Sequence, residues 1–377
     1  MSYEFGEHFI NLAQVKEDSF DQNCIPLLKE ENKLTSEYNV IIAQLEIIVE
    51  GEKYSIGNIS PLLSSSDRSL RKKAAEALYG ALESKQDAFD QIFHKLVQIR
   101  HEMAVKMGYE NYVELGYKKL NRTDYNSKDV AEYRKAIHDY VVPVVKKLKD
   151  RQKNRLGLDL MKYYDAGFKF KSGNPKPKGT PEEIVKNGEI MYKELSEETD
   201  EFFQFMLKHE LMDLNSREGK MAGGYAAIIG KYKYPFIFSN FNGTSHDVDV
   251  LTHEAGHTFQ FYRSLSQPIP EYYFPTYEAA EIHSMSMEFF AYPWMNSFFK
   301  EDEEKYKFSH LSGSISFLPY GAAIDEFQHF VYENPHISIN ERNRGWLEIE
   351  KKYDLSADKE NNKYLESGRF WQKQGHL

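Results

Sequence analysis

Five consecutive residues, His253-Glu254-Ala255-Gly256-His257, carry the clearest chemistry in the sequence. Residues four apart on a helix lie on the same face, so His253 and His257 would present their imidazoles together. Glu254 would place a carboxylate beside them. An H-E-x-x-H run on a helix is typical of a zinc site in which the glutamate acts as general base. The run therefore predicts half of a catalytic metal site.

The residues after this run exclude two classes of zinc site. A metzincin needs Gly and His three and six positions after the second histidine, where this chain has Gln260 and Arg263. A closed structural site is rich in cysteine, and Cys24 is the only cysteine. What remains is two histidines and a carboxylate, with one position open for water, which is the arrangement of catalytic zinc sites.

A second predicted helix supplies candidate carboxylates. The segment 277–290 has a helical pattern of apolar and small residues and contains Glu278, Glu281 and Glu288. Glu281 and Glu288 are seven apart and share a helix face. Carboxylates on a buried face are costly unless they are paired or bound to a metal. We therefore expect this face to look toward the zinc.

Composition limits the other functions. The chain has 377 residues, 41% of them hydrophobic, and a formal net charge of −10. It is long enough for a large core, and its negative charge argues against nucleic acid as a partner. There is no leader-like N-terminus and no run of 18 apolar residues, so neither secretion nor a membrane partner is expected. A single cysteine fits the cytoplasm. The oligomeric state is left open, and an oligomer is not excluded.

The remaining pattern predicts a mainly α protein of two helical lobes, with a small β-hairpin next to the active-site helix. We expect an N-terminal helical lobe over 1–175 and a catalytic lobe over 176–377. The predicted helices are a segment capped by Ser66 or Asp67, 86–107, 128–155 capped by Ser127 and interrupted at Pro143, and 181–195 capped by Thr180.

The one β region that the sequence predicts lies just before the zinc motif. Segments 223–230 and 234–241 are rich in β-branched and aromatic residues and read as a hairpin. We assign it to peptide binding by strand addition; an ordinary sheet edge is the alternative. The substrate-binding candidates are Gly223, Gly224, Tyr225, Phe238 and Asn240.

Several stretches resemble one known family. The motif HEAGH is followed by EIHSMSME and preceded by FIFSNFNGTSHDVDVLT, and KLNRTDYN (119–126), YYDAGFKF (163–170) and FLPYGAAIDEFQHFVYENP (317–335) also fit. Together they resemble the oligoendopeptidase F branch of the thimet-type zinc oligopeptidases, peptidase family M3. The resemblance covers most of the chain. It implies a mainly helical molecule with a deep internal channel that cleaves short peptides.

The expected chemistry is that of a zinc endopeptidase. One Zn²⁺ per chain is expected on His253, His257 and Glu281, with Glu254 taking the proton of the zinc-bound water that attacks the peptide. Glu288 and Asp249, and less directly Glu278, are expected to hydrogen-bond the ligating imidazoles. The default for His246, His283, His310, His329 and His336 is a role in packing or hydrogen bonding, or exposure to solvent. Thr244 or Ser245 is expected to cap the motif helix.

The C-terminal sequence departs from the family pattern. Members carry a Tyr-rich segment after a Gln-Gly-His sequence, whereas this chain ends at Leu377. The resemblance implies that His376 helps to steady the oxyanion, while the family's Tyr has no counterpart. We therefore expect a short form that binds zinc and peptides but turns over slowly. Tyr225 and Tyr277 are candidates to replace the missing Tyr.

Two alternative functions stay open. One is a truncated, catalytically weak form that binds zinc and peptides. The other is a metallocarboxypeptidase on a related helical scaffold, which would need a cation for the substrate's terminal carboxylate. Arg263, Arg342 and Arg344 are available for that role, but no motif singles one out.

Overall fold

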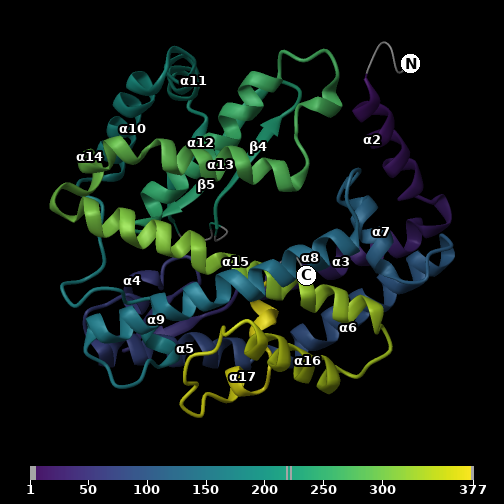
Figure 1. Ribbon diagram of the computed structural model, residues 1–377. Coiled ribbons are helices and arrows are strands. Elements are labelled where there is room, and N and C mark those ends of the chain that lie inside the picture. The colour runs from purple at the N-terminus through teal and green to yellow at the C-terminus, as the bar shows by residue number, and fades with distance from the viewer. Residues whose placement is uncertain (1–5, 218–219, 221–222, 375–377) are drawn as a thin grey trace. The chain divides into compact units, whose positions relative to one another are not determined.

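The computed structural model describes residues 6–217, 220 and 223–374. Its contacts divide the chain into two compact units (Figure 1). Unit 1 comprises residues 1–55, 65–172 and 311–377, and unit 2 comprises 56–64 and 173–310. The expected domain division at 175/176 stays a prediction, and residues 311–377 pack with unit 1. The structure is mainly helical with small sheets, which confirms the fold class.

Unit 1 is built from helices and one short hairpin. Its elements are α2 (Glu7–Asp18), α3 (Ile25–Ala43), β1 (Ile47–Val49), β2 (Glu52–Tyr54), α5 (Arg68–Glu83), α6 (Gln86–Lys106), α7 (Tyr112–Lys119), α8 (Ser127–Ala136), α9 (Val142–Leu156), α16 (Ile339–Lys352), α17 (Lys363–Glu366) and the later part of α15 (Glu303–Glu333). The β1–β2 hairpin was not predicted, because strands of three residues are too short to show alternation.

The helix boundaries in unit 1 follow local side-chain chemistry. The Asp67 carboxylate caps α5 by accepting from two backbone N–H groups. Asn126, rather than the expected Ser127, caps α8 and forms a capping box with Asp129. The expected kink or break at Pro143 is a change of helix type rather than a break: α8 continues through a π-helical turn, Ile137–Val141, into α9, and Pro143 lies in the first turn of α9. A π-helical turn beside a proline is a common way for a helix to accommodate the missing N–H.

Unit 2 contains the motif helix and the sheet. Its elements are α4 (Ser60–Leu63), α10 (Pro181–Leu195), α11 (Glu197–Lys208), β3 (Met212–Asn215), β4 (Tyr225–Ile229), β5 (Tyr234–Phe241), α12 (His246–Ser264), α13 (Tyr277–Phe290), α14 (Met295–Phe299) and the start of α15. The predicted capping box at Thr180 is present. Buried aromatic rings, among them Tyr192, Phe202 and Phe298, form much of the core.

The sheet of unit 2 has the order β3-β5-β4. β4 and β5 pair antiparallel, with Tyr225 opposite Phe238, as the sequence predicted for a hairpin. The parallel strand β3 was not predicted. Side chains of β5 alternate between partly buried and buried, and α12 packs against this strand and β4 (Figure 1). β4 is thus an edge strand lying on the motif helix.

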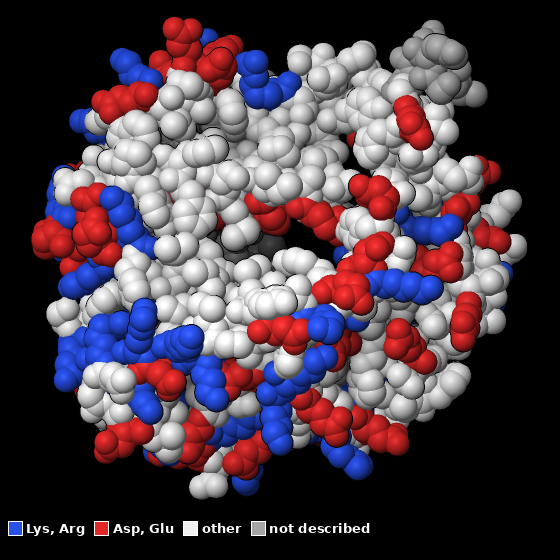
Figure 2. Space-filling view, in the orientation of Figure 1, with Lys and Arg blue, Asp and Glu red and all other residues white. Residues whose placement is uncertain are grey.

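The surface carries mixed charge. On the face shown in Figure 2, Lys and Arg side chains lie among Asp and Glu side chains rather than in one basic field. Within the described residues, no helix is long and apolar enough to cross a membrane.

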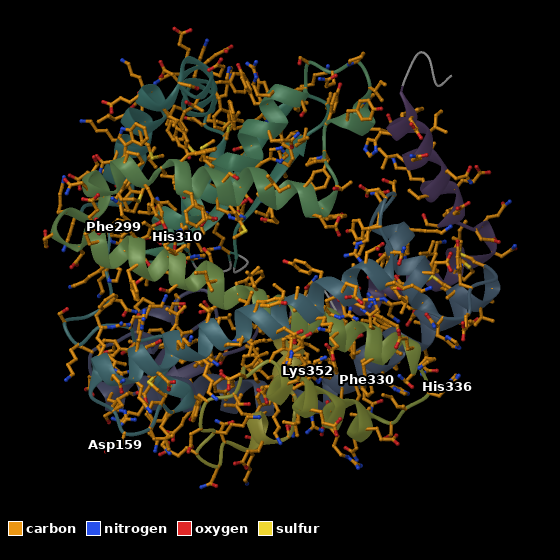
Figure 3. All side chains as sticks on the ribbon, in the orientation of Figure 1. Asp159, Phe299, His310, Phe330, His336 and Lys352 are labelled. Carbon is orange, nitrogen blue, oxygen red and sulfur yellow. The ribbon has the colours of Figure 1, made fainter. Side chains whose placement is uncertain are left out.

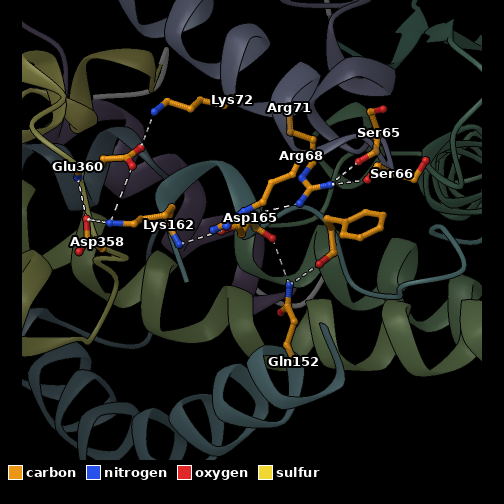
Figure 4. Close-up of polar contacts among 11 residues, drawn as sticks. Ser65, Ser66, Arg68, Arg71, Lys72, Gln152, Lys162, Asp165, Asp358 and Glu360 are labelled. Atoms are coloured by element: carbon orange, nitrogen blue, oxygen red, sulfur yellow. Dashed lines mark hydrogen bonds and ion pairs between the residues drawn. The ribbon is translucent and has the colours of Figure 1, made fainter. Parts of the chain in front are cut away.

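A buried ion cluster fixes the segment 163–170 in unit 1 (Figure 4). The Asp165 carboxylate is fully buried and accepts two hydrogen bonds from Arg68, at 3.0 and 2.7 Å, and one from Arg71, at 3.0 Å. The backbone N–H of Lys162 donates to the same carboxylate at 3.0 Å. Burial would raise the pKa of Asp165, but these donors outweigh it and hold the pKa below its ordinary value.

Asp165→Asn should destabilise the protein by about 3–5 kcal/mol, because it leaves Arg71 buried without its charge partner. Since the pKa of Asp165 is lowered, the ionised carboxylate stabilises the fold above its ordinary pKa of about 3.9, and this contribution is lost below it. In denaturant unfolding, the difference in unfolding free energy between the wild type and Asp165→Asn should therefore become smaller as the pH is lowered. The control is Glu46→Gln in the exposed Lys53–Glu46 pair, which should change stability little. Equal effects of both variants would contradict this account.

Candidate metal centre

The motif helix α12 is anchored at its first turn by an aspartate. The expectation that the side chain of Thr244 or Ser245 caps α12 is wrong. Ser245 occupies the N-cap position, but its side chain makes no capping hydrogen bond. Instead, the Asp247 carboxylate accepts from the backbone N–H groups of Asn242 and Gly243, both at 2.8 Å. These hydrogen bonds connect the end of β5 to the start of α12 and thereby fix the position of the motif helix along the sheet.

Helices α12 and α13 touch backbone to backbone at the motif glycine. A Cβ added to Gly256 would lie 2.6 Å from Cα of Ser284 and 2.7 Å from the carbonyl oxygen of His283. No other residue fits there without moving a helix. The close approach lets the Glu281 side chain reach the two imidazoles on α12.

Three donor atoms converge at this crossing. Nε2 of His253 and Nε2 of His257 lie 3.2 and 3.6 Å from Oε2 of Glu281. Among the described residues, these three form the one group of side chains that could hold a metal ion. The buried Ser284 hydroxyl donates to Oε2 of Glu281 at 2.7 Å and fixes that carboxylate. The residues proposed as ligands from the sequence are therefore brought together.

The outer nitrogen of His253 has a carboxylate partner. Nδ1 of His253 lies 2.6 Å from Oε1 of the buried Glu288. Glu288 is one of the residues expected from the sequence to hydrogen-bond a ligating imidazole. Asp249 instead accepts from the Tyr306 hydroxyl at 2.7 Å and contacts neither imidazole in the described hydrogen bonds. Glu278 is exposed at the start of α13.

Positive charge is favoured in this cluster. Burial opposes protonation of His253, but hydrogen bonds to Glu281 and Glu288 raise its pKa to about 10. The hydrogen bond from His253 lowers the pKa of Glu281 to about 2, against the effect of burial. Burial and the neighbouring carboxylates raise the pKa of Glu254 to about 7. Three carboxylates around two imidazoles thus create an excess of negative charge that a cation would offset.

The edge strand of the sheet begins beside Glu254. A Cβ added to Gly224 would lie 3.2 Å from Cγ1 of Val250 and 3.5 Å from Oε1 of Glu254, so it would press on Val250 and take up space in front of Glu254. Gly223 has a φ of +100°, which favours glycine, and its carbonyl accepts from the Asn240 amide at 2.8 Å. The rings of Tyr225 and Phe238 stack at 5.0 Å. The five residues assigned to peptide binding therefore lie together where the start of β4 pairs with the end of β5.

The other candidates from the sequence are not among the three described donor side chains. His376 falls outside the described residues. His283 is exposed on α13. Tyr277 is 55% exposed, one turn before Glu281 on the same helix. Arg342, a candidate to hold a terminal carboxylate, is completely buried and cannot meet a ligand.

Sequence reasoning missed three side chains that support the site: Ser284, Tyr306 and His310. Ser284 could have been found, since it follows Glu281 by three positions and shares its helix face. Tyr306 and His310 are four apart on α15, a spacing that also puts both on one face. Nothing in the sequence, however, indicates that α15 packs against the motif helix.

A cavity of about 220 Å³ in unit 1 is a second place where charged side chains meet. It is lined in part by Arg100, Lys119 and Asp325. Arg100 and Lys119 both contact the Glu31 carboxylate, and Asp325 pairs with Arg134. Arg100, Lys119 and Asp325 each already have an ion-pair partner, so none of these three groups by itself indicates a ligand.

Comparison with known proteins agrees with the geometry. The profile of peptidase family M3 matches residues 61–373. A solved structure of PZ peptidase A with an inhibitor superposes with a TM-score of 0.98 at 51% identity, covering 100% of this chain and 67% of that one.

Curated relatives are more distant in sequence. Group B oligopeptidase PepB of Streptococcus agalactiae is 23% identical over 84% of this chain and 53% of its own length. An oligoendopeptidase F homolog of Lactococcus lactis is 26% identical over 66% of this chain and 40% of its own length. The chain thus spans about half the length of these relatives.

Gly256→Ala should destabilise the protein by about 1–3 kcal/mol, because the added methyl group meets backbone atoms that cannot move independently. Gly80→Ala is a matched control: Gly80 is also inside a helix, but an added Cβ has nothing within 4 Å. That change should stabilise the protein by up to about 1 kcal/mol through helix propensity. Chemical denaturation measures both, and a neutral Gly256→Ala would refute the close helix contact.

Proposed function

The chain belongs to peptidase family M3, and we propose that it is a zinc-dependent endopeptidase that hydrolyses internal bonds of short peptides. One observation carries the proposal. Glu254 follows the metal-competent His253 directly on α12, and its Oε1 lies 3.5 Å from the Cβ position of Gly224, next to the start of the edge strand β4. A base is thus held where a metal-activated carbonyl and a bound peptide would meet.

The donor set fits zinc. Two ligands of a tetrahedral zinc ion, each about 2.0–2.1 Å from the metal, are about 3.3 Å apart. The distances from Oε2 of Glu281 to the two Nε2 atoms, 3.2 and 3.6 Å, are close to this value. Two imidazoles and one carboxylate are a ligand set of catalytic zinc. When bound, the ion would polarise the scissile carbonyl and make a water molecule more acidic.

The protein's own groups supply the remaining chemistry. Glu254 accepts a proton from the attacking water and passes it to the leaving amine. Its side chain is only 7% exposed, so competing bulk water is largely kept away. Glu281, held by Ser284, and His253, held by Glu288, keep their donor atoms aimed at one point.

The edge strand provides for a peptide backbone. β4 has β5 on one side, so its other side can add a strand through main-chain hydrogen bonds. Gly223 and Gly224 let a substrate backbone approach the base closely. The stacked Tyr225 and Phe238 rings offer an apolar contact for a side chain. Strand addition needs an extended chain, so the substrates are short, unfolded peptides rather than folded domains. The single cysteine fits an enzyme that works in the cytoplasm.

A carboxypeptidase is less well supported. Such an enzyme needs an accessible cation beside the metal centre for the terminal carboxylate. Arg342 is buried, and the exposed Arg263 and Arg344 make no described hydrogen bond or ion pair with the three donor side chains. A peptide with an amidated C-terminus and an internally quenched fluorophore separates the two activities. An endopeptidase cleaves it, and a carboxypeptidase does not. Loss of cleavage with a chelator and recovery with zinc would tie the activity to the metal, while slow but zinc-dependent cleavage would identify the catalytically weak form.

Glu254→Gln should keep zinc and lower kcat by about 10²–10⁴-fold, because the side chain acts as a base and is not a metal ligand. Glu304→Gln removes a carboxylate of the same unit that is 88% exposed, and should change neither zinc content nor kcat. Metal analysis and the quenched-peptide assay provide the two readouts. Cleavage at the wild-type rate by Glu254→Gln would show that this residue is not the base.

A further inference from the structure

The His310 imidazole lies in a closed aromatic cage behind the metal centre. Its side chain is 5% exposed, near the start of α15 (Figure 3). The ring stacks on Tyr306 at 5.7 Å and meets Phe289 and Tyr292 edge-on at 5.0 and 5.5 Å. These contacts fix the plane of the imidazole, so each of its nitrogens points in one defined direction.

Hydrogen bonds from this ring lead to the first metal ligand. The Tyr292 hydroxyl lies 2.7 Å from Nδ1 of His310, and Nε2 of His310 contacts Oε2 of Glu288. The other carboxylate oxygen of Glu288, Oε1, lies 2.6 Å from Nδ1 of His253. The chain therefore runs from Tyr292 through His310 and Glu288 to His253.

The hydrogen positions in this chain follow from Glu288. A carboxylate accepts only, so both imidazole nitrogens facing Glu288 must carry hydrogen. In the singly protonated ring of His310, Nδ1 is then an acceptor for the Tyr292 hydroxyl, which also lies 3.4 Å from the Lys307 carbonyl oxygen. When a metal takes the place of the proton on Nε2, His253 keeps its hydrogen on Nδ1, toward Glu288, and its Nε2 lone pair faces the side of Glu281. The outer residues thus select the tautomer that can bind a metal.

The rotation of Glu288 depends on both of its partners. A donor on each oxygen fixes the carboxylate plane, whereas a single donor leaves it free to turn about the Cγ–Cδ bond. The side chain of Glu288 is 10% exposed, so water cannot readily replace a lost partner. Removal of the His310 donor would therefore loosen the acceptor that orients His253.

We propose that His310 and Tyr292 are positioning residues for the metal centre, acting through Glu288 on the orientation and tautomer of His253. The inference rests on the proposed zinc-dependent function. It assigns a role to a histidine whose default from the sequence was packing or exposure, and it extends the site from the motif helix to α15.

The test compares two substitutions of His310 by their zinc dissociation constants, measured by competition with a chelator. His310→Leu keeps much of the volume and removes the donor, and should weaken zinc binding by about 10–100-fold. His310→Gln can place its amide N–H near the position of Nε2 and should stay close to wild type. Tyr292→Phe keeps the ring, removes the hydroxyl, and should weaken binding by a smaller factor.

Unit 1 offers matched controls. His329 is also buried, with its Nε2 3.1 Å from the Tyr117 hydroxyl. His329→Leu and Tyr117→Phe should cost stability without changing zinc affinity, which separates positioning from general loosening of the fold. If His310→Leu does not fold, the zinc affinities of Tyr292→Phe and Tyr117→Phe are compared instead, and only Tyr292→Phe should bind zinc more weakly than the wild type.

Two results would overturn the inference. One is wild-type zinc affinity in both His310→Leu and Tyr292→Phe. The other is equal weakening by His310→Leu and His310→Gln, which would show that the ring matters only for packing. A wild-type protein that binds no zinc would instead refute the proposed function, and the inference with it.

Discussion

The contact between α12 and α13 at Gly256 is the constraint on which the site depends. Side chains normally keep packed helices apart. Here the backbones meet, because a Cβ added to Gly256 would lie only 2.6 Å from Cα of Ser284. Only this approach lets Glu281 on one helix meet His253 and His257 on the other. Besides two of the candidate metal ligands, the motif therefore contains a glycine, Gly256, that the packing of α12 against α13 requires.

Buried charge is the second requirement, and the same rule governs both units. At the site, the buried Glu288 meets His253, and Ser284 donates to Glu281, whose side chain is 53% exposed. In unit 1, Asp165 is held by two arginines. Such groups contribute little net stability because desolvation opposes their attraction. The aromatic cores supply the stability, and the charged clusters fix geometry.

Local patterns in the sequence predicted the helical class, the hairpin, the irregularity next to Pro143 and the cluster of His253, His257 and Glu281, since these depend on local sequence or on spacing along two helices. What depended on tertiary packing was missed. β3 pairs in parallel with β5, the second strand after it in the sequence, and His310 reaches Glu288 only because α15 packs behind the motif. The cap of α12 was misassigned because Asp247 reaches back across the turn to Asn242 and Gly243, in competition with the nearer hydroxyls.

The central claim is that one zinc ion binds at the crossing of α12 and α13. Metal analysis of the purified chain after dialysis against zinc tests it most directly. The account predicts one zinc per chain in the wild type, and loss of that zinc in both His257→Ala and Glu281→Gln, one from each helix. Full zinc content in either variant would contradict the claim.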